Sequence, residues 1–298
     1  MSEKLAHPAR YGGTDLGYVD FDKAKVVIVP VPYERTATYR KGTKNGPAAI
    51  FEASDNMELF DEELNVETHK IGIYTMAPLD VMNSSPEDMI ETVYKTTKDI
   101  LIAEKFPVLI GGEHSVSIGA VKAVKDVVGE LSVLQLDAHC DLRDEYEGTK
   151  NNHACAGRRI QEIVPLVQLG IRNISKEEKE FLSGENNIAR MVSAYDMLND
   201  SLWDKKAVDV LKEKVYISID LDVLDTSIMP AVGTPEPGGL GWYLILDILR
   251  MVTQNKEIVG FDVVELAPLE GNITPDFLAS KLIYRLLGYI FFGKNKKR

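Results

Sequence analysis

Residue types that bind metal ions gather in three segments of this 298-residue chain. In each segment an apolar run leads directly into them: PVLIGGEHS at 107–115, LSVLQLDAHCD at 131–141 and VYISIDLDVLD at 215–225. Carboxylate oxygens and imidazole nitrogens are donors for divalent transition ions. The carboxyl ends of parallel strands open onto one crevice, so three such segments can deliver their polar side chains to one place. The pattern therefore predicts a metal site.

The spacing inside these segments predicts which side chains share a face. Asp137, His139 and Asp141 stand at alternate positions, and alternate side chains of an extended chain point the same way. Ala138 and Cys140 then point away from that face. The same alternation joins Asp220 with Asp222, and His114 stands at the expected start of a helix, where the helix dipole favours a neutral ring. The predicted ligands are His114, Asp137, His139, Asp141, Asp220 and Asp222.

The charge of this set indicates two ions. Four of the six residues are aspartates, and crowded carboxylates cannot all stay ionised without compensation. One divalent ion leaves two of the four charges uncompensated, whereas two ions neutralise the set. Mn²⁺ suits mixed oxygen and imidazole ligands best, Fe²⁺, Co²⁺ and Zn²⁺ are alternatives, and Ca²⁺ fits poorly. Two such ions activate a water molecule, which predicts a hydrolase.

Simpler interpretations of the same residues compete with this one. A single Asp-X-His-X-Asp is more often a hydrogen-bonded turn, and His114 alone can cap a helix or lie in the core. A structural zinc site of Cys140, His153 and Cys155 lacks a fourth soft ligand, so both cysteines are expected to be small buried residues. A dinucleotide-binding loop is excluded because the G-x-G-x-x-G spacing is absent.

Alternating strand-like and helix-like stretches must position these residues. This alternation is typical of a parallel sheet whose two faces are covered by crossover helices. We predict strands at 25–31, 70–75, 107–111, 131–137, 165–170, 189–193, 214–220 and 257–265. We predict helices near 46–59, 86–105, 115–127, 154–163, 176–183, 205–213, 241–255 and 275–291. No linker or repeat divides residues 1–298, which predicts one α/β domain.

Polar residues before two prolines predict helix starts. Ser84 and Ser85 precede Pro86, and Thr274 precedes Pro275. Serine and threonine favour the N-cap and proline the first turn, so these residues predict N-caps for the two helices.

Composition narrows the partners and the compartment. A formal charge of −12 argues against nucleic acid, because only the terminal GKNKKR is basic, and that segment is expected to be a solvated end. The polar start carries no secretion signal, and no apolar run approaches the roughly 20 residues that span a bilayer. Two cysteines suit a reducing compartment. We therefore expect a cytoplasmic protein with no membrane partner.

GGEHS, DAHCD, SIDLDVLD followed by GTPEPGGL, and VVEL together resemble the ureohydrolases, the arginase and agmatinase family. The likeness reaches YRKGTKNGPAAIFEAS at 39–54 and so covers nearly the whole chain. It implies a three-layer α/β/α fold with a mostly parallel sheet of about eight strands, two Mn²⁺ per chain and a homo-oligomer, trimeric or hexameric. It places one ion on His114, Asp137, Asp141 and Asp220, and the other on Asp137, His139, Asp220 and Asp222, with Asp137 and Asp220 bridging.

The resemblance also implies hydrolysis of a guanidinium group to urea and an amine. Glu265 in VVEL matches the acid that pairs with the guanidinium, and His153 in NNHACAGRR matches a histidine that shuttles protons or orients substrate. Thr234 in GTPEPGG lies in a loop that two prolines stiffen over the site. Catalytic roles thus fall on His153, Glu265 and the ligand Asp141, and substrate binding on His153, Thr234 and Glu265. The alternatives are that His153 is a surface histidine, that Glu265 is a surface acid and that Thr234 lies in a purely structural turn.

Departures from the family pattern bear on the substrate. The run LRDEYEGTKNNH replaces the Asn- and Ser-bearing stretch of arginases, which disfavours arginine. Its acids, Asp144, Glu145 and Glu147, would suit a substrate that ends in an amine. Agmatine, cleaved to putrescine and urea, is therefore the first expectation.

Two residues beside His153 leave other substrates open. Agmatinases often carry Ser or Asp before this histidine and Gly after it, whereas this chain has Asn152 and Ala154. N1-aminopropylagmatine and guanidinobutyrate therefore remain alternatives. A single-zinc amide deacetylase of the same fold and a non-catalytic polyamine-binding regulator are the rival classes.

Overall fold

The computed structural model describes residues 10–13, 19–184, 189–200 and 202–293. The first nine residues and the basic tail predicted to be a solvated end lie outside these ranges, apart from Gly293. An eight-stranded sheet runs through the protein in the order β4-β1-β5-β10-β9-β6-β7-β8, and each neighbouring pair is parallel. Its strands are β1 (Val26–Val31), β4 (Ile73–Thr75), β5 (Phe106–Gly111), β6 (Ser132–Leu136), β7 (Leu166–Ile171), β8 (Ala189–Ser193), β9 (Lys214–Asp220) and β10 (Glu257–Val264).

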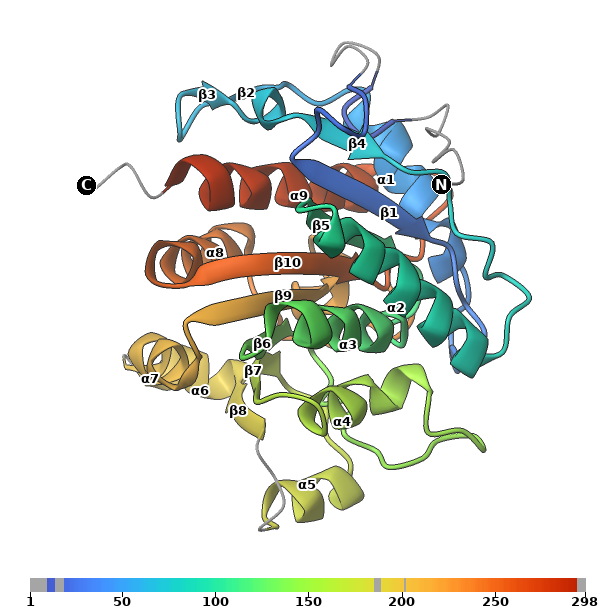
Figure 1. Ribbon diagram of the computed structural model, residues 1–298. Helices are drawn as coiled ribbons and strands as arrows, with labels where there is room; N and C mark the ends of the chain where they lie inside the picture. Colours follow the sequence, from blue (N-terminus) through green and yellow to red (C-terminus); the bar gives the residue numbers. More distant parts are fainter. Residues whose placement is uncertain (1–9, 14–18, 185–188, 201, 294–298) are drawn as a thin grey trace.

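Helices cover both faces of the sheet and make three layers (Figure 1). On one face lie α2 (Pro86–Ile102), α3 (Val116–Val128), α4 (Ala156–Gln161) and α5 (Lys176–Leu182). On the other lie α1 (Gly46–Ser54), α6 (Ala194–Asn199), α7 (Trp203–Val210), α8 (Trp242–Asn255) and α9 (Thr274–Phe292). The described ranges also contain the short 3₁₀ helices η2 (Thr43–Asn45), η3 (Thr68–Ile71), η4 (His153–Cys155) and η5 (Leu221–Val223). The predicted three-layer fold is confirmed.

Strand β1 shows why apolar runs form this sheet. All six of its residues are buried, because helices cover both faces. Val26 and Ile28 pack into the core shared with α8 and α9, whereas Val27 and Val29 pack into the core shared with α2 and α3. The pleat thus divides one continuous β-branched run between two cores.

The structure differs from the predicted elements at a few points. The hairpin of β2 (Phe60–Asp61) and β3 (Val66–Glu67) and the short helix α6 were not predicted, and α1 ends at Ser54 rather than near 59. The hydroxyl of Ser85 accepts the Asp88 N–H, so the predicted cap of α2 is confirmed. The predicted cap at Thr274 is wrong: α9 already begins there, and the Asn272 side chain accepts the Thr274 N–H instead.

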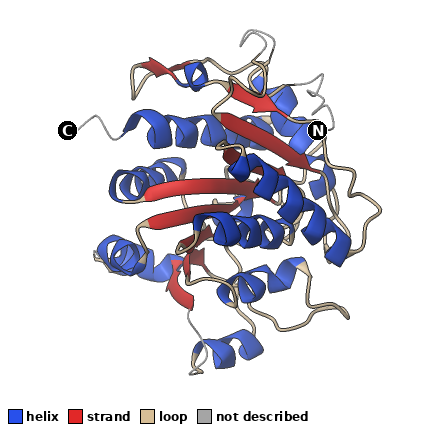
Figure 2. Ribbon diagram, viewed as in Figure 1, coloured by secondary structure: helices blue, strands red, loops and turns tan. Residues whose placement is uncertain are grey.

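The central strands of the sheet end at one edge, which Figure 2 shows among the surrounding loops. Strands β5, β10, β9 and β6 are consecutive neighbours and run parallel, so the loops that follow them begin side by side. In an open parallel sheet this edge is where ligands bind.

Within the described residues we find no helix with both the length and the apolar character needed to cross a bilayer.

Candidate metal centre

A predicted site residue lies at the end of each of the four central strands or within three residues after it. Asp137 directly follows β6, Asp220 is the last residue of β9, Glu265 directly follows β10, and His114 comes three residues after β5. Because these strands are adjacent and parallel, their side chains meet at one edge of the sheet. The structure thus brings the three ligand-bearing segments together.

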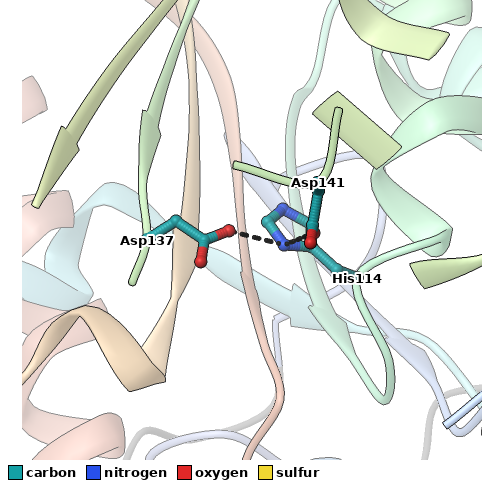
Figure 3. A group of neighbouring side chains, drawn as sticks. All are labelled: His114, Asp137 and Asp141. Atoms are coloured by element: carbon teal, nitrogen blue, oxygen red, sulfur yellow. Dashed lines mark ion pairs between the residues drawn. The ribbon is translucent and has the colours of Figure 1, made fainter. Parts of the chain in front are cut away.

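His114, Asp137 and Asp141 form the first cluster (Figure 3). The Nδ1 atom of His114 lies 3.1 Å from an oxygen of Asp137 and 3.2 Å from one of Asp141. An oxygen of Asp220 lies 3.2 Å from the same nitrogen. His114 is 1% exposed and Asp137 is fully buried, so water does not screen this group.

Hydrogen bonds behind the first cluster decide which nitrogen of His114 faces it. Its Nε2 atom lies 3.0 Å from the Ser218 hydroxyl, which donates to Asp262 at 2.7 Å. Since the hydroxyl proton is used on Asp262, Nε2 must carry the proton that joins it to Ser218. In the neutral ring, which a metal ion requires, the lone pair of Nδ1 therefore faces the carboxylates.

This arrangement fits a cation. The Nδ1 atom of His114 is buried and has no hydrogen-bond partner within the described part of the chain. Carboxylate oxygens and an imidazole lone pair repel one another unless a positive charge lies between them, and together they are a donor set for a divalent transition ion. The first cluster can therefore bind a metal ion.

Asp137, His139 and Asp222 form a second cluster of metal-type donors. The Nδ1 atom of His139 lies 2.8 Å from an Asp222 oxygen and 3.8 Å from Oδ1 of Asp137, whose other oxygen faces His114. Asp137 thus belongs to both clusters, as a bridging ligand requires. Oδ2 of Asp220 faces His114 and its Oδ1 accepts the Asp222 N–H at 2.9 Å, so its bridging role stays a prediction.

Turns, rather than extended strands, align the aspartates. Strand β6 ends at Leu136, and Asp141 has a positive φ of 52°. Asp222 lies within η5, and Asp220 caps that turn by accepting the Asp222 N–H. The predicted alternation was therefore wrong as a mechanism for Asp141 and for the second pair, although Asp141, Asp220 and Asp222 line one cavity and Asp137 faces the same His114 nitrogen as Asp141. Short hydrogen-bonded turns also place residues i and i+2 on one side.

Crowding of the carboxylates shows in their proton affinities. Burial and the charges of Asp222 and Asp141 raise the pKa of Asp137 to about 7. Burial and the charges of Asp222 and Asp137 also raise the pKa of Asp220 well above its usual value. Burial lowers the pKa of His139, but the charge and hydrogen bond of Asp222 outweigh it and raise that pKa to about 11. The carboxylates thus compete for positive charge, as the charge arithmetic predicted.

Glu265 stands beside the first cluster. One of its oxygens accepts the His114 backbone N–H at 2.8 Å, and its side chain lines the cavity. The predicted strand 257–265 ends one residue earlier, because Glu265 has a positive φ of 68°. Burial and the charge of Glu113 raise the pKa of Glu265 well above its usual value. A cationic group next to it would relieve that cost.

His153 and Thr234 line the same cavity of about 280 Å³, together with Glu265. The four ligand candidates on its wall are His139, Asp141, Asp220 and Asp222. His153 begins η4, whose N-cap Asn152 accepts the Ala154 N–H. The structure therefore gathers all the predicted catalytic and substrate-binding residues around one cavity, while the roles assigned to them stay predictions.

The acids expected to face a substrate amine lie elsewhere. None of Asp144, Glu145 and Glu147 is among the described residues that line the cavity, and Asp144 pairs with Arg159 at 2.8 Å. The reason is local, since an arginine on the next helix and Lys150 already neutralise that carboxylate. Glu178 lines the cavity instead.

Both cysteines are free and buried, as expected. The Cys140 thiol lies 3.6 Å from the sulfur of Met191, although Cys140 also lines the cavity, where it was predicted to point away from the acidic face. Burial raises the pKa of Cys155 to about 11, and burial also raises the pKa of Cys140, so both remain thiols near neutral pH. Neither cysteine belongs to a metal-type cluster in the described ranges, which removes support for a structural zinc site.

Several buried polar residues around the site were not predicted. They are Thr36, Glu113, Ser218 and Asp262, each less than a tenth exposed. The available signal was a polar residue inside an apolar run, as in VYISID and VGFDVV. Such residues must find partners when buried, but the sequence does not name the partners.

A three-layer α/β fold with a donor set that can hold metal ions is typical of a class of hydrolases. A model of the Arginase family matches residues 24–288, and the chain belongs to this family. The resemblance to the ureohydrolases is thereby confirmed.

Individual relatives and solved structures agree with this family. An N(1)-aminopropylagmatine ureohydrolase of Synechocystis sp. is 42% identical over 282 residues, which is 92% of each chain. An agmatinase of Pyrococcus horikoshii is 35% identical over 95% of this chain and 98% of its own. The crystal structure of the agmatine ureohydrolase of Thermoplasma volcanium aligns with a TM-score of 0.85 and 30% identity over 94% of each chain.

Proposed function

We propose that this arginase-family ureohydrolase cleaves the guanidinium group of a linear cationic substrate to urea and an amine, with two Mn²⁺ per chain. The observation that supports this proposal is the cavity that joins two Asp/His clusters to the buried Glu265. A buried carboxylate whose pKa is raised favours a cationic group beside it, and a guanidinium offers paired donors to such an acid.

The residues present fit the proposed metal pair. His114, Asp137, Asp141 and Asp220 would hold one ion, and Asp137, His139, Asp220 and Asp222 the other. Bound divalent ions lower the pKa of water and stabilise negative charge that develops during hydrolysis. Glu265 would orient the guanidinium, His153 would carry protons, and Thr234 would contact the substrate from the cavity wall.

N1-aminopropylagmatine is the substrate we place first. The sequence alone favours agmatine as the substrate. The relative at 42% identity, however, is named for N1-aminopropylagmatine, whereas the agmatinase is 35% identical. The unusual neighbours of His153, Asn152 and Ala154, agree with a substrate other than agmatine. Both compounds present a guanidinium at one end and an amine at the other, so the chemistry at the clusters is the same.

A urea assay tests this proposal. The Mn²⁺-loaded protein is supplied with N1-aminopropylagmatine, agmatine, guanidinobutyrate and arginine, and released urea is measured. We expect the highest kcat/KM for N1-aminopropylagmatine and the lowest for arginine. Urea from none of the four compounds contradicts the proposed reaction, and a higher kcat/KM for agmatine restores the first expectation.

Metal stoichiometry separates the rival enzyme class. About two ions per chain support the proposal, and a single tightly held zinc ion supports an amide deacetylase. We propose in addition a cytoplasmic homo-oligomer, trimeric or hexameric, which sedimentation of the native protein tests.

A further inference from the structure

We propose that Thr36 and Glu113 form a buried relay that fixes the tautomer and orientation of His153, so that this histidine exchanges protons only through Nε2. The inference deepens the proposed function, because it rests on a catalytic role for His153. It makes Thr36 and Glu113 positioning residues, since they act on the reaction through the histidine.

The hydroxyl of Thr36 is the centre of the relay. It donates to Glu113 at 2.7 Å, accepts the backbone N–H of His153 at 2.9 Å and lies 3.2 Å from Nδ1 of the same histidine. Thr36 is 7% exposed, so water does not compete for these contacts. Two separate contacts to one residue, one to its backbone and one to its ring, hold the histidine in a single orientation.

Glu113 is surrounded by donors. One oxygen accepts the backbone N–H groups of Arg35 and Thr36, both at 2.7 Å. The other accepts the hydroxyls of Thr36 at 2.7 Å and Ser115 at 2.6 Å. The carboxyl is fully buried, and four donors directed at two oxygens match a carboxylate that only accepts hydrogen bonds.

The direction of these bonds sets the tautomer of His153. The single proton of the Thr36 hydroxyl is used on Glu113, so its oxygen can only accept from the ring. Nδ1 must therefore carry a proton, and in the neutral ring Nε2 holds the lone pair. Because His153 lines the cavity, this free nitrogen is the one available to substrate.

The same contact persists when the ring is charged. An imidazolium donates from both nitrogens, and Thr36 accepts from Nδ1 in either state. A proton taken up at Nε2 can thus leave from Nε2, for instance to the nitrogen of the departing amine, while the ring keeps its orientation. Proton transfer between fixed groups avoids reorganisation in each turnover.

Two substitutions at Thr36 test the relay by activity. Thr36→Val keeps the shape and removes the hydroxyl, and we expect kcat to fall about 10- to 100-fold with KM changed less than about threefold. Thr36→Ser restores the hydroxyl and should recover kcat to within about threefold. Thr97→Val is the matched control, because Thr97 is a buried threonine of α2 whose hydroxyl has no partner among the residues described. Equal kcat in Thr36→Val and the wild type overturns the proposal.

Nitrogen NMR tests the tautomer independently of activity. Long-range ¹⁵N–¹H spectra are recorded on protein loaded with diamagnetic Zn²⁺, and His153→Gln identifies the ring signals. We expect protonated Nδ1 and unprotonated Nε2 in the wild type and in Thr36→Ser, and loss of this single tautomer in Thr36→Val. The same tautomer in Thr36→Val overturns the proposal. Absence of urea release by the wild type contradicts the proposed function, whereas these spectra still decide the relay.

Discussion

Asp137 is the residue on which both clusters depend. One oxygen accepts a hydrogen bond from the Gln135 amide at 2.7 Å and faces His114, and the other accepts the His139 N–H at 2.6 Å. These bonds fix the carboxylate so that each oxygen serves a different cluster. A donor that is held in place loses little rotamer freedom when an ion binds, which favours tight binding.

Asp220→Asn tests the shared ligand set. The substitution removes one charge from a group that faces His114, so we expect metal content to fall below two ions per chain and urea release to fall with it. Atomic absorption and the urea assay measure the two quantities on one preparation. Cys140→Ala is the control, because that thiol contacts Met191 and should leave metal content unchanged. Full metal content and full activity in Asp220→Asn would contradict the assigned role.

Strands β9 and β10 support the first cluster from behind. Ser218 on β9 links His114 to Asp262 on β10, and the Tyr216 hydroxyl donates to the other Asp262 oxygen at 2.8 Å. Adjacent parallel strands hold these side chains at a fixed separation. Neighbouring groups that orient a metal-binding histidine often decide its affinity.

Ser218→Ala tests this support. Removing the hydroxyl frees the His114 ring to change tautomer, and we expect divalent-ion affinity to fall about 10- to 100-fold. Tyr216→Phe is the comparison, because it keeps the link between Ser218 and Asp262 and should change affinity less than about threefold. Calorimetric titration of the metal-free proteins measures both constants. Equal affinities in Ser218→Ala and the wild type would show that the link does not orient the ligand.

For the elements of the fold, the sequence predicts strands better than turns. Apolar runs, of which KVVIVPV and KVYISID are two, predict all eight strands of the sheet, because burial on both faces demands continuous apolar residues. The left-handed backbones of Asp141 and Glu265 and the turn at Asp222 follow from local hydrogen bonds that carry no periodic signal. The hydrogen bonds of Thr36 to His153 and of Ser218 to His114 join residues about a hundred positions apart, so no local sequence pattern reveals them.

The whole molecule places an acidic site at the centre of its sheet. The four strands that carry the site are the central four of eight, so their ends are flanked by loops from both sides. Fully buried carboxylates such as Asp137 and Asp262 are tolerated there because each accepts hydrogen bonds from neighbouring donors. The organisation of residues 1–298 as one domain stays a prediction.

Asp276 affects the stability of the molecule rather than the site. It lies in the first turn of α9, and its Oδ1 atom is buried without a hydrogen-bond partner in the described structure. Burial and the charge of Glu52 on α1 raise the pKa of Asp276 to about 6 from its usual value of 3.8. The folded protein therefore binds a proton that the unfolded chain has released between these pH values. The contribution of Asp276 to the free energy of unfolding therefore falls as the pH rises through about 6.

Asp276→Asn should reverse that loss. An amide does not ionise, so we expect the variant to exceed the wild type in free energy of unfolding by about 1 kcal/mol at pH 8. This figure allows for solvent screening and for the helix N-terminus, which favours the charged form. The advantage should vanish near pH 4, where the wild-type carboxyl is protonated. Urea denaturation of the metal-free proteins at both pH values measures the difference. Glu52→Gln should produce a smaller gain with the same pH dependence, and a gain independent of pH in either variant would show that ionisation of Asp276 is not its cause.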